Sequence, residues 1–336
     1  MMLRFEKYKS QFDIILLNDS TLEECVRKGS CLSSCLKCSE PKCFKLDSEL
    51  FDIDELEDFS YDRDDTVCPV EAISFNNGYP IIDQEKCIMC GLCISVCPAC
   101  AVCQKEDKLI INKDLTPLQY VAKPTKANLL KQSEQIKKLM TINYSGNSIA
   151  INSKSLKLIQ DKLNYANSSY HNKIVRNLLI GLGCKATVPR TGDNANRMDG
   201  VFTTENGEIG VVEVEFGTDS LSTARGLLDD IAMLQYKQNI KKEKIRPLAV
   251  LLSMPNKRGD YWNVIQDIKK ETGILINTIT IAALMVLLWK KKKLDFNTNP
   301  YYIDVTNPSI KKQIEKHINE KIKLPTGFMG IFEPEK

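Results

Sequence analysis

The chain has 336 residues, 43% of them hydrophobic and 26% charged, so it is long enough for two or three domains and excludes wholesale disorder. The net charge of +3 conceals an asymmetry, since residues 1–110 hold 12 Lys and Arg against 21 Asp and Glu, whereas residues 111–336 hold 34 against 22. Two parts with different partners are therefore expected. Nucleic acid is the leading candidate for the basic part, and surplus solvated lysines are the plain alternative.

Cysteines are concentrated near the N-terminus. Twelve of the 13 fall between Cys25 and Cys103, and only Cys184 lies outside that stretch. No apolar core follows the basic residues at the start of the sequence, so we expect no secretory signal and a cytoplasmic location. In that setting, clustered cysteines indicate metal ligands rather than disulfides.

The order of patterns along the chain predicts two domains and a connector. The first domain is expected at 1–110 with an acidic insertion near 44–67, the connector at 111–152 and the second domain at 153–336. Aromatic residues are spaced among the carboxylates of the acidic stretch. This pattern predicts an ordered insertion with a short helix, and not a binding site.

Strand and helix patterns alternate in the second domain. The expected elements are helices at 155–165 and 169–181, strands at 197–203 and 208–216, a helix at 223–238, a strand at 247–253 and a helix at 261–272. The Glu205-Asn206-Gly207 turn between the first two strands predicts a hairpin. The alternation predicts an α/β domain with a mixed central sheet.

The uncharged segment 273–289 imitates a membrane span. It is short at 17 residues and contains Asn277, and its first half is rich in β-branched residues. We therefore predict a buried strand at 273–279 followed by a core helix at 280–288 that Thr280 caps, and no membrane partner.

The densest cysteine motif is Cys87-x2-Cys90-x2-Cys93-x3-Cys97-Pro98. Three thiolates on one tight loop can bind three irons of one cluster, while the fourth points at a neighbouring cluster. Gly91 lets the backbone curl close to the sulfurs.

A second, stretched copy of the motif precedes the first. Cys68-Pro69 echoes Cys97-Pro98, so the module contains an internal duplication. Upstream stand four cysteines, one more than a cluster loop needs: Cys31, Cys35, Cys38 and Cys43. We favour Cys35, Cys38 and Cys43 with Cys97 for the first cluster, because Cys31 departs from the usual spacing, and structural zinc is the alternative for Cys35–Cys43. The second cluster is assigned to Cys68, Cys87, Cys90 and Cys93.

These motifs resemble those of the bacterial two-cluster [4Fe–4S] ferredoxins over about 75 residues. The resemblance implies an α+β ferredoxin-like module that carries out low-potential, one-electron transfer. The remaining cysteines are expected to be small buried apolar residues: Cys25, Cys31, Cys100, Cys103 and Cys184.

Carboxylates converge in the second domain. Glu213 and Glu215 share one face of a strand because side chains alternate, and Asp199 on the adjoining strand can lie opposite them. Three such carboxylates repel one another unless a hard cation such as Mg²⁺ lies between them. The alternative is that these acids mark the wet face of a half-exposed strand.

This pattern resembles the PD-(D/E)xK, or restriction-endonuclease-like, superfamily, with Glu215 where the pattern has lysine. The resemblance implies that Asp199 and Glu213 bind the metal, and that Glu215 helps to bind it or orients the attacking water. It also implies phosphate contacts from basic residues near these strands: Arg190, Arg197, Arg225 and Lys237. His171 is interpreted as an ordinary histidine.

Two functions follow as hypotheses. The first is a Mg²⁺-dependent DNA endonuclease of the restriction type fused to an iron–sulfur module, and by analogy a homodimer. The second is a ferredoxin-type electron-transfer or redox-sensing protein, whose second domain binds nucleic acid or a redox partner without cutting.

Overall fold

The computed structural model describes residues 45–56, 59–76, 79–96, 102–111, 149–193, 196–296, 301–303, 305–306 and 308–335. The chain divides into two compact units, one of Met1–Leu46 with Asp65–Ala150 and the other of Asp47–Asp64 with Ile151–Lys336. The sequence pattern assigned the acidic insertion to the first domain. The structure instead groups Asp47–Asp64 with the second unit.

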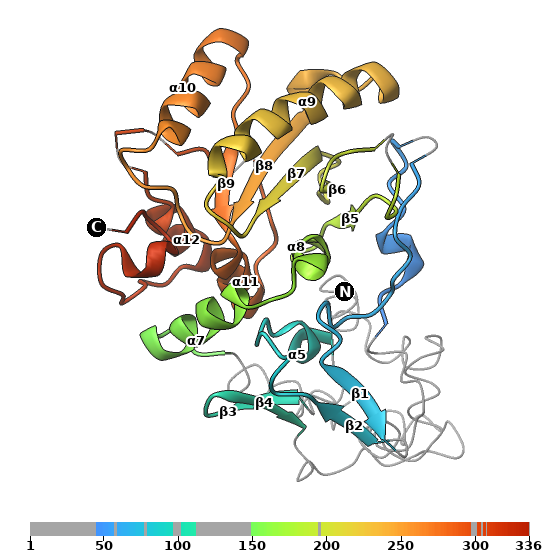
Figure 1. Ribbon diagram of the computed structural model, residues 1–336, viewed down its shortest axis with the longest axis vertical. Helices are drawn as coiled ribbons and strands as arrows, with labels where there is room; N and C mark the ends of the chain where they lie inside the picture. The colour runs from blue at the N-terminus through green and yellow to red at the C-terminus, as the bar shows by residue number, and fades with distance from the viewer. Residues whose placement is uncertain are drawn as a thin grey trace, which may run out of the picture. The chain divides into compact units, whose positions relative to one another are not determined.

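Two short hairpins and one helix make up most of the described part of the first unit. They are β1 (Ile73–Asn76), β2 (Tyr79–Ile82), α5 (Leu92–Val96), β3 (Val102–Lys105) and β4 (Lys108–Ile111) (Figure 1). Each hairpin is antiparallel, and the Gln84 side-chain amide donates to the Leu109 carbonyl at 2.8 Å between them. Each hairpin also begins five residues after the cysteine of a Cys-Pro pair, which agrees with the predicted duplication.

The base of the acidic insertion is closed by backbone pairing inside the first unit. Lys45 and Thr66 form an antiparallel bridge, and the Leu46 N–H donates to the Asp65 carbonyl at 2.5 Å. The chain therefore leaves the first unit at Leu46 and returns to it at Asp65, and the two ends of the insertion lie side by side.

A five-stranded mixed sheet forms the centre of the second unit. Its strands are β5 (Lys185–Thr187), β6 (Gly200–Thr203), β7 (Ile209–Glu215), β8 (Ile245–Leu251) and β9 (Asn277–Thr280), in that spatial order. Strand β6 runs antiparallel to both β5 and β7. Strand β8 runs parallel to both β7 and β9. The mixed sheet predicted from the alternating pattern is confirmed.

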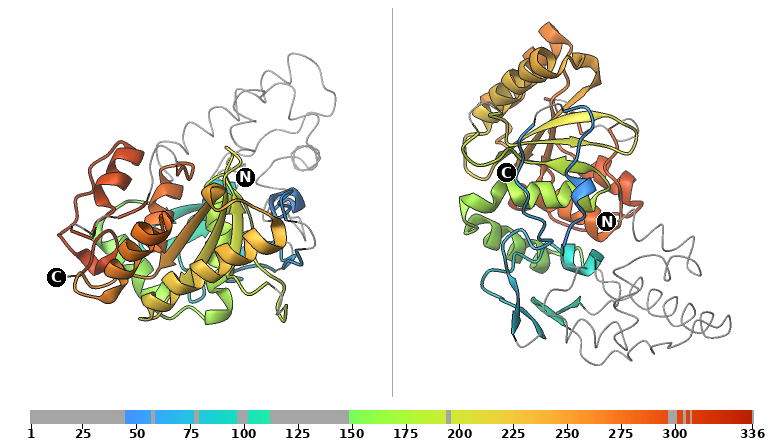
Figure 2. Two further views of the ribbon diagram at one scale, coloured as in Figure 1. Left: turned by 90° about the horizontal axis from the view of Figure 1, so that it is seen from above. Right: turned by 90° about the vertical axis from the view of Figure 1, so that its right-hand side faces the viewer.

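The second unit also contains helices, which pack on this sheet or on one another. They are α7 (Ser153–Asn164), α8 (His171–Gly181), α9 (Ser220–Gln238), α10 (Asp260–Thr272), α11 (Ile281–Trp289) and α12 (Lys311–Ile318), with 3₁₀ turns η2 (Ser48–Leu50), η3 (Ser168–Tyr170), η4 (Lys242–Lys244) and η5 (Phe328–Gly330). Helix α9 runs along β7 and β8 with α10 beside it, while α8 packs on β5, β6 and β7 (Figure 2).

The apolar segment predicted as a strand followed by a core helix is β9 followed by α11. The Thr280 hydroxyl accepts the Ala283 N–H at 3.2 Å and so caps the helix. All nine residues of α11 are buried, because α7, α8 and α12 pack around it. Among the described helices, none is long and apolar enough to span a membrane.

The acidic insertion is held on the second unit by an apolar contact and a buried cation. Phe51 and Ile53 are buried, and the Arg176 guanidinium of α8 stacks over the Phe51 ring at 4.9 Å. In Figure 1 this blue segment lies beside β5. The predicted ordered insertion with a short helix is confirmed, and the helix is the 3₁₀ turn η2.

Candidate functional site

Four thiols line one cavity in the first unit. Two of them lie on the loop from residue 87 to 91, a third lies in the first turn of α5, and the fourth comes from the segment before β1. Apolar side chains complete the wall: Val70, Ala72, Ile73, Ile82, Ile88, Leu92 and Leu109. The structure therefore brings together the four cysteines assigned to one cluster, Cys68, Cys87, Cys90 and Cys93.

The loop can wrap around this cavity because two residues adopt left-handed backbone conformations. Gly91 has φ 82°, which glycine adopts without steric cost. Met89 has φ 56°, which is uncommon for a residue with a side chain, and its side chain is buried in compensation. The Cys87 N–H donates to the Asp83 carbonyl at 3.0 Å and fixes the start of the loop. Helix α5 begins directly after Gly91.

The surroundings of the thiols suit an iron–sulfur cluster. Burial raises the pKa of Cys68 and of Cys90, and the neighbouring Cys68 and Cys87 thiols raise that of Cys90 further. The Ala72 N–H donates to the Cys68 Sγ at 3.2 Å, the kind of bond that tunes cluster potentials. Ionising these four thiols without a metal is costly because they are buried and close together. A bound iron–sulfur cluster would remove that cost, because its irons would take the place of the protons on the sulfurs.

The other predicted cluster ligands lie outside the described residues: Cys35, Cys38, Cys43 and Cys97. Cys25, Cys31 and Cys100 also lie outside them. Cys184 is buried, as predicted, whereas Cys103 on β3 is only partly buried.

A carboxylate site lies in the second unit around the end of β7. The Asp199 Oδ1 accepts from the Asn172 side-chain amide and its Oδ2 from the Val214 N–H, both at 2.9 Å. These bonds hold Asp199, which directly precedes β6, beside β7 and Glu213. The structure thus brings Asp199 and Glu213 together as predicted.

A third carboxylate, Asp230 of α9, meets Glu213. The Cβ of an alanine at Gly226 would lie 2.9 Å from the Glu213 Oε2, so the missing side chain lets Glu213 approach α9. Asp230 lies one helical turn after Gly226 and is 4% exposed. Within the described part of the chain, its Oδ2 has no hydrogen-bond partner.

Burial and mutual repulsion keep this site protonated. Burial, followed by the charges of Asp199 and Asp230, raises the pKa of Glu213 to about 9. Burial likewise raises the pKa of Asp230 to about 7 and that of Asp199 above its usual value. Glu213 and Asp230 therefore share a proton near neutral pH, and a bound cation would have to displace it.

The predicted third acid, Glu215, contacts its own chain rather than Glu213 or Asp199 in the part of the chain that the structure describes. Its carboxylate accepts the Gly217 N–H two residues along the chain, whereas Asp230 occupies the place beside Glu213. Sequence reasoning missed Asp230, although Gly226 four residues earlier marks the close approach of α9. It also missed Asn172, and His171, which stacks on Phe216 with ring centroids 3.8 Å apart near Asp199.

The four residues predicted to contact phosphate have separate surroundings in the described part of the chain. Arg197 pairs with Asp229 at 3.1 Å on the surface, and Arg225 and Lys237 are exposed on α9. Arg190 lines a separate cavity. Among the described residues, no three His, Cys, Asp or Glu side chains already lie in position to hold a single metal ion, so the thiols or the carboxylates would have to move closer together around a bound group.

The protonated carboxylates predict a pH-dependent stability. Because the folded state raises the pKa of Glu213, the folded chain holds its proton up to about pH 9, whereas the unfolded chain releases it near pH 4.5. Stability should therefore fall as the pH rises through this window. Without divalent metal, Glu213→Gln should raise the unfolding free energy by about 2–3 kcal/mol at pH 8, and by much less at pH 4.5.

Urea unfolding at the two pH values measures this effect. The chain's two tryptophans, Trp262 and Trp289, both lie in the second unit and report its unfolding by fluorescence. Glu215→Gln removes the same charge from the same strand, where the carboxylate accepts the Gly217 N–H, and serves as the control. An equal gain from Glu213→Gln at both pH values would contradict the prediction.

Comparisons with known proteins agree with the thiol cavity. Residues 78–99 match the family model of a 4Fe-4S binding domain. The chain is 31% identical over 133 residues to the uncharacterized ferredoxin MJ0155 of Methanocaldococcus jannaschii, an alignment that covers 37% of this chain and 82% of that protein. It is 48% identical over 42 residues to the uncharacterized ferredoxin MJ0265 of the same organism, covering 12% of this chain and 25% of that protein. No solved structure matches.

The thiol cavity and the matched domain define an iron–sulfur protein of the ferredoxin type. More particularly, the chain belongs to the ferredoxin family that includes the uncharacterized ferredoxin MJ0155.

Proposed function

We propose that the first unit is a one-electron carrier whose [4Fe–4S] cluster is held by Cys68, Cys87, Cys90 and Cys93. The observation that carries the proposal is that these four thiols line one largely apolar cavity. Such a cluster, when bound, stores one electron at low potential. The apolar wall would limit water around the sulfurs, and the Ala72 N–H would stabilise charge on Cys68.

A second cluster is proposed on Cys35, Cys38, Cys43 and Cys97. Support comes from the internal duplication, because a second Cys-Pro pair stands at the same distance from a hairpin. In the two-cluster arrangement each Cys-Pro cysteine serves the cluster of the other loop. Two clusters in one module suit electron relay between a donor and an acceptor protein.

Anaerobic purification with iron and sulfide quantitation tests both assignments. About eight irons per chain are expected, with a visible absorbance that dithionite bleaches and a mild oxidant restores. About four irons and one zinc per chain would mean that Cys35–Cys43 bind a structural zinc ion instead of a second cluster. An iron-free protein after anaerobic reconstitution would contradict the proposal.

The second candidate function is Mg²⁺-dependent DNA cleavage by the second unit. It is favoured by the meeting of Asp199, Glu213 and Asp230, with a buried carboxylate oxygen of Asp230 left unpaired. The order helix, strand hairpin, helix and strand, made by α8, β6 with β7, α9 and β8, is also the core that the PD-(D/E)xK resemblance implies, and β5 is an additional strand. A cation held there would activate water and stabilise the charge of in-line attack on phosphate.

The side chains have distinct roles in this candidate. Asp199 and Glu213 would bind the cation directly, and the Asn172 amide would orient Asp199. Asp230 would take part in binding after its shared proton with Glu213 is lost. Metal affinity should therefore rise between about pH 6 and pH 9.

Incubation of anaerobically purified protein with plasmid DNA and Mg²⁺ or Mn²⁺ tests this candidate. Glu213→Gln should lower the cleavage rate roughly 100-fold or more, since even groups that only support metal ligands are worth about 10–100-fold. Iron content should stay unchanged in this variant. Uncut DNA under oxidised and reduced conditions would instead favour a second domain that binds nucleic acid or a redox partner without cutting.

A further inference from the structure

A second cavity, lined by seven residues of the second unit, lies between the acidic insertion and the chain after β5. Its volume of about 640 Å³ is within the ~300–1,000 Å³ range of ligand sites. Aromatic, hydroxyl and guanidinium groups line it: Phe59, Ser60, Tyr61, Asp62, Arg63, Arg190 and Thr191. The sequence pattern predicts that the insertion is not a site, so this cavity is a feature that only the fold reveals.

Backbone pairing builds the cavity from two distant segments. Tyr61 and Pro189 form an antiparallel bridge. The Asp62 N–H donates to the Val188 carbonyl, and the Arg190 N–H to the Ser60 carbonyl, both at 3.0 Å. The insertion thus extends the edge of the sheet beyond β5 and sets Arg63 and Arg190 on one cavity.

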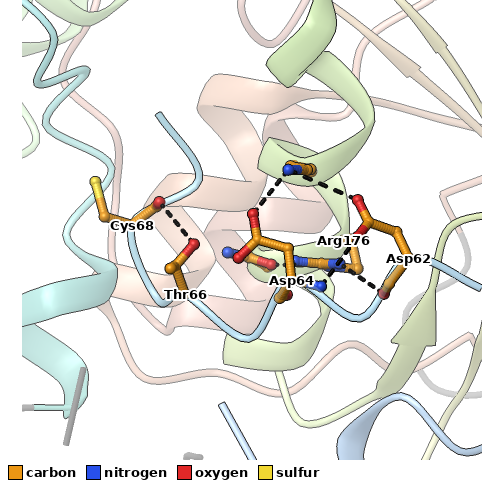
Figure 3. A network of polar contacts seen from close by, with 7 residues as sticks. Asp62, Asp64, Thr66, Cys68 and Arg176 are labelled. Atoms are coloured by element: carbon orange, nitrogen blue, oxygen red, sulfur yellow. Dashed lines mark hydrogen bonds and ion pairs between the residues drawn. The ribbon is translucent and has the colours of Figure 1, made fainter. Parts of the chain in front are cut away.

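Side chains of α8 fix the insertion from the other side. The Lys173 ammonium lies 2.7 Å from the Asp64 carboxylate and 3.6 Å from that of Asp62, and Arg176 donates to the Asp64 carbonyl at 2.8 Å (Figure 3). These contacts are half-buried or buried, so they hold the segment better than exposed ion pairs would. The cavity wall is therefore preorganised before any ligand arrives.

The charge of the lining favours an anion. Two arginines line the cavity against one acid, Asp62, which also lies 3.6 Å from the Lys173 ammonium that it shares with Asp64. Arg63 and Arg190 are exposed, and the Arg63 guanidinium lies 5.9 Å from the Tyr61 ring centroid. Guanidinium forks match phosphate oxygens, and an aromatic ring offers a stacking face to a base.

The segments that hold the cavity also hold the carboxylate site. Thr187 at the end of β5 pairs with Val201, two residues after Asp199, and Pro189, two residues after Thr187, pairs with Tyr61. On α8, Asn172 holds Asp199 while the next residue, Lys173, holds the insertion.

We propose that this cavity binds a nucleotide of a single-stranded nucleic acid, with its phosphate on Arg63 and Arg190 and its base on Tyr61. The proposal deepens the nuclease candidate by naming where substrate is held. It rests on that candidate only for the use of the bound strand, because binding itself needs no cleavage. A free nucleotide carries the same phosphate and base chemistry.

Fluorescence anisotropy of a labelled 12-nucleotide DNA with the intact iron-loaded protein, in magnesium-free buffer, tests the proposal. Arg63→Ala and Arg190→Ala should each weaken binding about 5–20-fold and reduce the salt slope by about 0.7. Tyr61→Leu should weaken it about 5-fold or more. Arg258→Ala, an exposed arginine on the loop before α10, is the matched control and should change nothing.

The outcomes separate this proposal from the nuclease candidate. Loss of binding in Arg63→Ala and Arg190→Ala supports the cavity even if no DNA is cut. Competition by AMP that these variants abolish would also support it, with a free nucleotide as the occupant. Affinity and salt slope as in the Arg258→Ala control would overturn it, even if the protein cleaves DNA.

Discussion

Anaerobically purified Cys90→Ser protein is expected to retain about half of the iron and sulfide of the native chain. Cys90 lines the cavity with three other thiols, and serine supplies only a hydroxyl that remains protonated at neutral pH. Apart from the cavity, the described part of this unit is held mainly by two two-stranded sheets and a five-residue helix. Such small elements depend on a bound group for folding energy, so residues 65–111 should also become sensitive to protease.

Cys103→Ser provides the matched control. Cys103 undergoes the same chemical change on β3, in the same unit, but does not line the cavity. It should keep all of its iron and the native digestion pattern. Full iron and unchanged absorbance in Cys90→Ser, or equal losses in both variants, would contradict the assignment of Cys90 as a ligand.

Local patterns predicted the parts of this fold that depend on neighbouring residues. The β9–α11 segment was predictable because β-branched residues precede a run of strong helix formers with Thr280 at its cap. The hairpin of β6 and β7 was predictable because Gly207 adopts a left-handed turn conformation there, with φ 73°. The thiol cavity was predictable in the same sense, since three of its four cysteines share one short segment.

Contacts between distant segments were not predictable in this way. Asp230 looks like any helix acid, and only the packing of α9 on β7 places it against Glu213. The insertion at 47–64 was predicted to be ordered, but only the fold shows that its Phe51 is buried under Arg176. Arg176 itself interrupts the apolar face of α8, and the fold explains it by the carbonyls it meets.

Helix α8 connects the features of the second unit. Its first turn holds Asp199 through Asn172, and Lys173 and Arg176 hold the inserted segment (Figure 3). That segment ends at Asp64, four residues before the cavity cysteine Cys68 along the chain. The carboxylate site and the cavity lined by Arg63 and Arg190 therefore both depend on one helix.

Arg176→Met should reduce the unfolding free energy of the second unit by about 3 kcal/mol, although methionine fills a similar volume. Arg176 is 2% exposed and donates to the Asn177 side-chain oxygen at 3.0 Å and to the Asp64 carbonyl at 2.8 Å. Both acceptors lose this donor in the variant, and Phe51 loses the cation above its ring. Urea unfolding followed by tryptophan fluorescence should show a midpoint lower by about 1 M.

Lys185→Ala removes a different cation that contacts the same inserted segment. Lys185 pairs with Asp54 at 3.7 Å, but both side chains are exposed, so the loss should be under about 0.5 kcal/mol. The contrast separates buried anchoring from surface charge attraction. Equal small losses in both variants would mean that the insertion only rests on the second unit. A large loss confined to Arg176→Met would make the segment an integral part of that unit, because desolvated donors rather than net charge would then hold it.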